Sequence, residues 1–192
     1  MELQVVERRL EAGECCELEA VPRIVYSVPD NAATYDTGAV SLAGPAHALC
    51  FELVPEASPQ AILAGPVPHG AAGDQLMRCD RVDFPPGGCA YLHTHRGPGL
   101  RVLLQGTIRI DTQGSSHGYG PLEAWFETGP DPVFAAADEH EPTAFVRCMV
   151  LPAELRGKSS IRYVRDEDAD KPKPQTYTVF VDQPLTDAPV AT

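Results

Sequence analysis

The sequence predicts an all-β fold, a sandwich or barrel of short antiparallel strands built as one domain. The chain has 16 glycines and 19 prolines among 192 residues, well above the roughly 12% that these two residue types usually supply together. Because they are spread along the whole chain, they indicate many short elements joined by turns. Apolar runs recur between the turns about every 8–12 residues, a spacing typical of a sandwich or barrel. With 43% hydrophobic and 22% charged residues, the chain has enough apolar side chains for a buried core.

The N-terminal part, residues 1–74, is expected to form a β extension and a loop packed on the main barrel. Short apolar runs at 23–26 and 47–54 are separated by turn residues at 29–31. Residues 57–73 are rich in proline, glycine and alanine, which predicts a long loop.

The barrel core is expected in residues 75–152, where alternating apolar segments are sharply divided by turns at 85–88, 96–99 and 113–121. The expected strands of this core are 77–84, 90–95, 100–104, 107–111, 123–127, 133–136 and 144–151.

Residues 153–192 are expected to form a C-terminal connection and a strand. Residues 162–173 are charged and predict a solvated connection, whereas 176–181 alternates as a strand does. A strand that follows a completed barrel pairs with the barrel edge or reaches a partner subunit.

The charge of the chain argues against several classes of partner. The net charge is −12 and the isoelectric point is about 4.8, so neither a nucleic acid nor an anionic membrane is expected to bind. The first residues lack the basic start and apolar core of a signal peptide, and no apolar stretch is long enough to span a membrane. A cytoplasmic location is therefore expected.

The cysteines predict reduced thiols rather than a disulfide or zinc framework. They are not arranged as Cys-x-x-Cys pairs, and two of them are adjacent. The six positions are Cys15, Cys16, Cys50, Cys79, Cys89 and Cys148.

The most informative pattern is a pair of histidines, His93 and His95, in the expected strand 90–95. Side chains two positions apart on a strand lie on the same face, which predicts that Tyr91, His93 and His95 line the barrel interior together. Two neutral imidazoles on one face can bind the same transition metal. At this point a hydrogen-bonded core role fits the pattern as well as metal binding does.

The residues around this pair resemble the first motif of the cupin superfamily. That motif reads Gly, five residues, His-x-His, three or four residues, Glu, six residues, Gly. Here Gly87, His93, His95 and Gly106 occupy the matching positions. The resemblance extends over residues 77–151 and implies a double-stranded β-helix, or jelly-roll barrel. It also implies that His93 and His95 are metal ligands and that the protein forms a homodimer.

The chain departs from the cupin pattern at the other ligand positions. Gly99 stands where the first motif has its Glu, and Pro132 and Ala136 stand where the second motif has its His and Asn. Glu127 takes the place of the Pro of that motif and is a candidate substitute ligand. A solvated turn residue is its alternative. His117 and Asp131 in this region, and His140 and Glu141 just beyond it, are further conceivable substitutes, of which His117 is most simply an exposed loop residue.

Two arginines, Arg101 and Arg147, alternate with apolar residues in expected strands. If they face the barrel interior, each is a buried cation that requires an anionic partner, such as a substrate carboxylate. If they face outward, each pairs with a surface carboxylate. We take Tyr91, Arg101 and Glu127 as candidate substrate-binding residues, whereas His47, His69 and His140 have no supporting neighbours.

The resemblance leads to two functional hypotheses. The first is a metal-dependent cupin that binds a small organic molecule in the barrel and acts as a dioxygenase, isomerase or lyase. Its cofactor would be a divalent transition metal, either Fe, Mn, Ni or Zn. The second is a non-catalytic cupin that binds or senses a small molecule and has a degenerate metal site.

Overall fold

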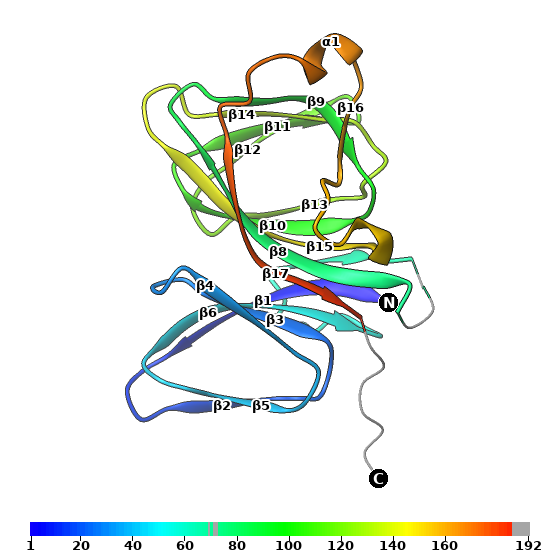
Figure 1. Ribbon diagram of the computed structural model, residues 1–192. Helices are drawn as coiled ribbons and strands as arrows, with labels where there is room; N and C mark the ends of the chain where they lie inside the picture. The colour runs from blue at the N-terminus through cyan, green and yellow to red at the C-terminus, as the bar shows by residue number, and fades with distance from the viewer. Residues whose placement is uncertain (69, 71–72, 186–192) are drawn as a thin grey trace.

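The computed structural model describes residues 1–68, 70 and 73–185. Within them, two β-structures lie one above the other (Figure 1). The barrel is built from residues 75–152 and two later strands, and a smaller N-terminal lobe is built from residues 2–66.

Eight strands of the barrel form a jelly roll. The strands pair as a long hairpin folded on itself, so that β8 pairs with β15, β9 with β14, β10 with β13 and β11 with β12, all antiparallel. This nested pairing is the jelly-roll topology that the cupin resemblance implies. The strands are β8 (Gln75–Phe84), β9 (Cys89–His95), β10 (Gly99–Gln105), β11 (Ile108–Thr112), β12 (Ser115–Tyr119), β13 (Ala124–Glu127), β14 (Val133–Ala137) and β15 (Thr143–Pro152).

Two C-terminal strands extend the two barrel sheets, each at one edge. The first sheet has the order β13-β10-β15-β8-β17 and the second β12-β11-β14-β9-β16. The short helical turns η1 (Ala153–Leu155) and α1 (Asp166–Ala169) lie between β15, β16 (Ile161–Tyr163) and β17 (Thr176–Pro184). No helix in the described residues is long and apolar enough to cross a membrane.

The N-terminal lobe consists of a five-stranded sheet and a two-stranded sheet. The larger sheet has the order β4-β3-β6-β1-β7, and the smaller one joins β2 to β5. Their bounds are β1 (Glu2–Leu10), β2 (Cys15–Leu18), β3 (Arg23–Ser27), β4 (Ala32–Asp36), β5 (Val40–Ala43), β6 (Ala46–Val54) and β7 (Leu63–Pro66).

Two segments predicted as loops contain strands. Residues 57–73 include β7, because its backbone completes the edge of β1, and Gly65 lies so close to the Phe126 ring that a Cβ there would clash at 2.3 Å. Residues 113–121 include β12, which pairs along β11 with mostly exposed side chains. Neither strand has the buried alternation from which the others were predicted. His69 lies outside the described residues.

One apolar core joins the lobe to the barrel. Side chains from the large N-terminal sheet pack against the outer face of the barrel sheet that contains β8, β10 and β15. A second core fills one end of the barrel interior, with Trp125, Phe84 and Phe145 among its members. The polar side chains described below lie above this second core, toward the barrel mouth.

Candidate binding site in the barrel

Five polar side chains face the barrel interior around one small cavity. They come from four strands: His93 and His95 from β9, Arg101 from β10, Glu127 from the end of β13 and Arg147 from β15. All are buried. The cavity between them has a volume of about 20 Å³, which leaves room for about one water molecule.

A β-bulge in β9 decides which side chains reach this cavity. Val133 of β14 pairs with His93, whereas Ala135 pairs with Ala90, so β9 has one residue more than its partner between these points. The bulge interrupts the alternation and places Ala90, rather than Tyr91, beside the histidines in the cavity wall. The half-buried Tyr91 ring instead lies under the ammonium group of Lys171, 4.9 Å from the ring centroid.

The two imidazoles form a closed hydrogen-bond network. His93 Nδ1 lies 2.7 Å from the Tyr91 carbonyl oxygen, so Nδ1 carries the proton and donates it. His93 Nε2 is therefore an acceptor, and it lies 3.2 Å from His95 Nε2, which donates to it. His95 Nδ1 then accepts from the Ser160 hydroxyl at 3.3 Å.

Burial keeps both histidines neutral. It lowers the pKa of His93, an effect that the charge of Glu127 partly opposes. It lowers the pKa of His95 well below the ordinary value, and the charges of Arg101 and Arg147 act in the same direction. Neutral imidazoles fit the network above, in which each ring donates one hydrogen bond.

Glu127 and Arg101 form a buried ion pair beside the histidines. Arg101 Nη2 lies 2.7 Å from Glu127 Oε2, with the two side chains 1% and 7% exposed. Glu127 Oε1 accepts a hydrogen bond from the Trp125 indole at 2.9 Å. The Arg101 side chain therefore faces inward, and Glu127 is a buried residue rather than a solvated turn residue.

These residues do not fit the metal site of a cupin. Among the described residues, no group of three or more His, Cys, Asp or Glu side chains is arranged to hold a metal ion. Glu127 Oε2 lies 3.5 Å from His95 Nε2, but the charge of that oxygen is already balanced by Arg101. Both histidine Nε2 atoms are engaged with each other, whereas catalytic metal sites generally use three protein ligands. The other candidates of the second motif, His117, Asp131 and His140, do not line the cavity.

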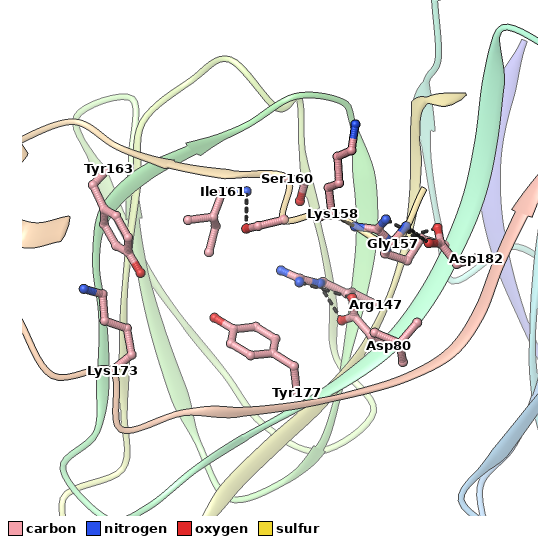
Figure 2. A pocket seen from close by; sticks show the side chains of 13 residues that line it. Asp80, Arg147, Gly157, Lys158, Ser160, Ile161, Tyr163, Lys173, Tyr177 and Asp182 are labelled. Atoms are coloured by element: carbon pink, nitrogen blue, oxygen red, sulfur yellow. Dashed lines mark hydrogen bonds and ion pairs between the residues drawn. The ribbon is translucent and has the colours of Figure 1, made fainter. Parts of the chain in front are cut away.

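A larger pocket adjoins this cavity, and Figure 2 shows the side chains that line the pocket. It has a volume of about 550 Å³, which suits a small organic molecule. Arg147, Ile161 and Tyr177 line both the pocket and the small cavity, so the two spaces adjoin. The remaining lining residues are Arg78, Asp80, Gly157, Lys158, Ser159, Ser160, Tyr163, Lys173, Val179 and Asp182.

The pocket is positively charged in a strongly acidic protein. Four cationic side chains line it, and only two carboxylates do. Arg78 is paired with Asp182 and Arg147 with Asp80. The two lysines, Lys158 and Lys173, form no ion pair within the described part of the chain. The chain has only three lysines, all between residues 158 and 173.

Arg147 lies at the base of the pocket. Its Nε and Nη2 donate to the two oxygens of Asp80 at 2.6 and 3.2 Å, and its guanidinium stacks over the Tyr177 ring at 5.5 Å. Figure 2 shows the guanidinium pointing into the open space. Burial lowers the pKa of Arg147, but Asp80 outweighs this effect and raises it above the ordinary value, so the side chain stays charged.

Sequence reasoning did not identify the pocket residues outside the motif. Asp80 had a signal, because a charged residue alternates there with the buried Met77 and Cys79 of a strand. Lys158, Lys173 and Tyr177 had none, since the segments that carry them reach the barrel mouth only through the tertiary fold.

The barrel combines nested antiparallel strand pairing with an inward-facing histidine pair on β9. The barrel has the cupin fold. No family model matches the chain, and no curated protein sequence matches it.

Several solved cupin-fold structures are similar to this chain. The DMSP lyase DddQ from Ruegeria pomeroyi DSS-3 is 18% identical, with a TM-score of 0.40, over 47% of this chain and 44% of the lyase. A cupin-2 domain from Rhodospirillum rubrum is 20% identical, with a TM-score of 0.38, over 54% of this chain and 66% of that one. A variant of salicylate 1,2-dioxygenase from Pseudoaminobacter salicylatoxidans is 7% identical, with a TM-score of 0.38, over 84% of this chain and 67% of the dioxygenase. The chain thus spans less than half the length of the lyase, and these similarities concern the fold alone.

Proposed function

We propose that this cupin binds a small organic anion, a carboxylic acid with an apolar or aromatic body, at the mouth of its barrel. The observation that carries the proposal is the excess of cationic side chains around a 550 Å³ pocket in a chain with a net charge of −12. Two of the three lysines of this acidic chain line the one opening, and an anionic ligand would be attracted there.

The lining of the pocket offers contacts both for the carboxylate group and for the apolar or aromatic body of such a ligand. Arg147 is held rigidly by Asp80, and a fixed guanidinium is well suited to bind a carboxylate. Tyr163 and Ile161 offer apolar surface elsewhere in the lining, and the Tyr177 ring lies against the guanidinium. Lys158 and Lys173 lie around the same space and add charge (Figure 2).

The small cavity below the pocket suits a water molecule better than a ligand group, because its volume is about 20 Å³. Arg147 would therefore lie between the histidine pair in the cavity and the anion bound in the pocket. The metal-dependent hypothesis has less support, since the ion pair between Glu127 and Arg101 engages the third possible ligand.

Ligand binding can be measured with the single tryptophan of the chain, Trp125. Its ring lines the cavity that adjoins the pocket, so its fluorescence is expected to respond when the pocket fills. We expect aliphatic and aromatic carboxylates to bind and their neutral primary amides not to bind. Lys158→Ala and Lys173→Ala should each weaken binding, and added salt should weaken it further.

His117→Ala is the matched control, because this histidine is exposed on β12 away from the mouth. Equal binding of acids and amides, or unchanged affinity in both lysine variants, would contradict the proposal.

A further inference from the structure

We propose that Arg101 is the resident cation of this barrel and excludes a metal ion from the side chains of His93, His95 and Glu127. The inference concerns the small cavity and does not depend on which anion occupies the pocket above it. It rests on the position of Arg101, on the spacing of the three neighbouring side chains and on the space at Gly99.

Two separations between neighbouring donor atoms are close to those of ligands around a metal. The two histidine Nε2 atoms are 3.2 Å apart, and Glu127 Oε2 is 3.5 Å from His95 Nε2. Donor atoms about 2.0–2.1 Å from a tetrahedral metal are separated by roughly 3.3 Å. His95 Nε2 therefore lies at a ligand-like separation from one imidazole and one carboxylate, although the described residues as they stand form no three-residue metal group.

The positive charge among these donors belongs to Arg101. Its Nη2 contacts the same oxygen, Glu127 Oε2, at 2.7 Å, and its Nη1 donates to the Gly99 carbonyl at 2.6 Å. Neither Arg101 Nη2 nor Glu127 Oε2 has a hydrogen-bond partner in the described residues, so the two atoms are held together as an ion pair. A dication at this carboxylate would meet a buried guanidinium at short range, where little solvent screens the repulsion.

The backbone explains why the carboxylate comes from β13. A Cβ on Gly99 would lie 2.6 Å from the Cys148 carbonyl oxygen and 2.7 Å from the Met149 side chain, so a side chain does not fit there. Glu127 is the cross-strand partner of Gly99 and brings a carboxylate to the same level of the barrel. Arg101, two positions along β10, then neutralises it.

The proposal predicts that removing the guanidinium creates a metal site. Chelator-treated protein would be titrated with Co²⁺ and followed by the visible absorption of protein-bound cobalt and by calorimetry. We expect the wild type to bind weakly and Arg101→Met to bind one Co²⁺ at least about tenfold more tightly. Arg101→Lys, which keeps the positive charge, should stay as weak as the wild type.

Matched variants identify the side chains that bind Co²⁺ in the Arg101→Met protein. The double variants Arg101→Met/Glu127→Gln and Arg101→Met/His93→Ala should lose the gain. Arg147→Met should not gain Co²⁺ affinity, because Arg147 neutralises Asp80 rather than Glu127.

Two results would overturn the proposal. One is tight stoichiometric Co²⁺ binding by the wild type that His93→Ala removes. The other is a folded Arg101→Met protein that binds Co²⁺ no better than the wild type. If Arg101→Met does not fold, Arg101→Gln replaces it, since the amide can still donate to the Gly99 carbonyl without carrying a charge. The Co²⁺ titration of the wild type tests the exclusion of metal even if neither variant folds. It is a separate experiment from the carboxylate titration, which tests the ligand pocket.

Discussion

Glu127 lies directly opposite Gly99, the two residues facing each other across β13 and β10. The cupin motif has its carboxylate ligand at the position of Gly99, and here the neighbouring strand provides one instead. Because Arg101 also lies on β10 and faces the same way as Gly99, the carboxylate and a guanidinium enter the barrel together. The result is a charged but internally balanced group of side chains beneath an open cationic pocket.

Replacing either Arg101 or Glu127 alone is expected to lower the free energy of unfolding much more than replacing both residues together. Glu127→Gln or Arg101→Met leaves one charge buried and uncompensated, which should lower the free energy of unfolding by about 3–5 kcal/mol. The double variant Arg101→Met/Glu127→Leu removes both charges and should lose much less. Urea unfolding of the three proteins checks this.

The exposed ion pair of Arg109 and Asp111 provides the comparison for the variants of the buried pair. These side chains are 56% and 36% exposed, so Arg109→Met should change the free energy of unfolding by no more than about 1 kcal/mol. A single Arg101 variant as mild as this one would mean that Glu127 is not effectively buried.

The thiols are expected to react with alkylating reagents in two classes. Cys15 is exposed, whereas Cys50, Cys79 and Cys148 are buried. Burial raises the pKa of Cys50 to about 12 and that of the other two buried thiols well above the ordinary value. Because the thiolate is the reactive form, these three should stay unmodified in native protein at pH 8.

Mass spectrometry after iodoacetamide treatment checks this prediction, with and without denaturant. Cys15 should be modified under both conditions, and the three buried thiols only in denaturant. Early modification of Cys79 or Cys148 in native protein would show that the barrel opens locally.

The sequence predicted the barrel well because its strands bury one face. In β8 and β15 the apolar alternation and flanking turns mark the elements, and both strands form as predicted. Strand β7 was missed because it is defined by backbone pairing with β1 and has little apolar pattern.

The candidate site could be predicted only in part. His93 and His95 were found because the motif fixes their spacing. The direction of Arg101 was ambiguous, since alternation alone does not say which face of a two-sided strand is the interior. Tyr91 was placed with the histidines by alternation, and the bulge in β9, which has no sequence signal of its own, separates it from them. The lysines of the pocket come from a connection of residues 153–175 whose path depends on the whole fold.

The homodimer predicted from the family resemblance stays a prediction, and the edge strand β17 is the surface on which we test it. This strand lies at the edge of its sheet, and Val179 on it is 55% exposed. Pairing of two such edges would cover both the open backbone groups and the apolar side chains. Light scattering should give about twice the chain mass of 20.7 kDa, and Val179→Lys should shift the mass toward the monomer. A monomer mass throughout the micromolar range would count against the dimer.

The stability of the protein is expected to fall below about pH 6.5 because of the histidine pair. Burial lowers the pKa of His93 and His95 in the folded state, whereas in the unfolded chain both titrate near the ordinary value of about 6.5. Between these values the unfolded state binds more protons than the folded state does, so protonation favours unfolding. Above about pH 6.5 both states are neutral at these positions and the pair has no effect. As the pH drops from 6.5 toward the lowered pKa values, stability is lost progressively.

Urea unfolding of the wild type and of His95→Gln at pH 7.5 and pH 5.5 isolates this contribution. The glutamine cannot titrate, so His95→Gln should lose less stability than the wild type between the two pH values, whatever its stability at pH 7.5. His117→Gln is the control, because that histidine is exposed and its removal should leave the pH dependence unchanged. Equal losses in the wild type and His95→Gln would mean that His95 is not held neutral by the barrel. His95 Nδ1 would then donate to the Ser160 hydroxyl rather than accept from it, and the network from the Tyr91 carbonyl to Ser160 would be reassigned in that sense.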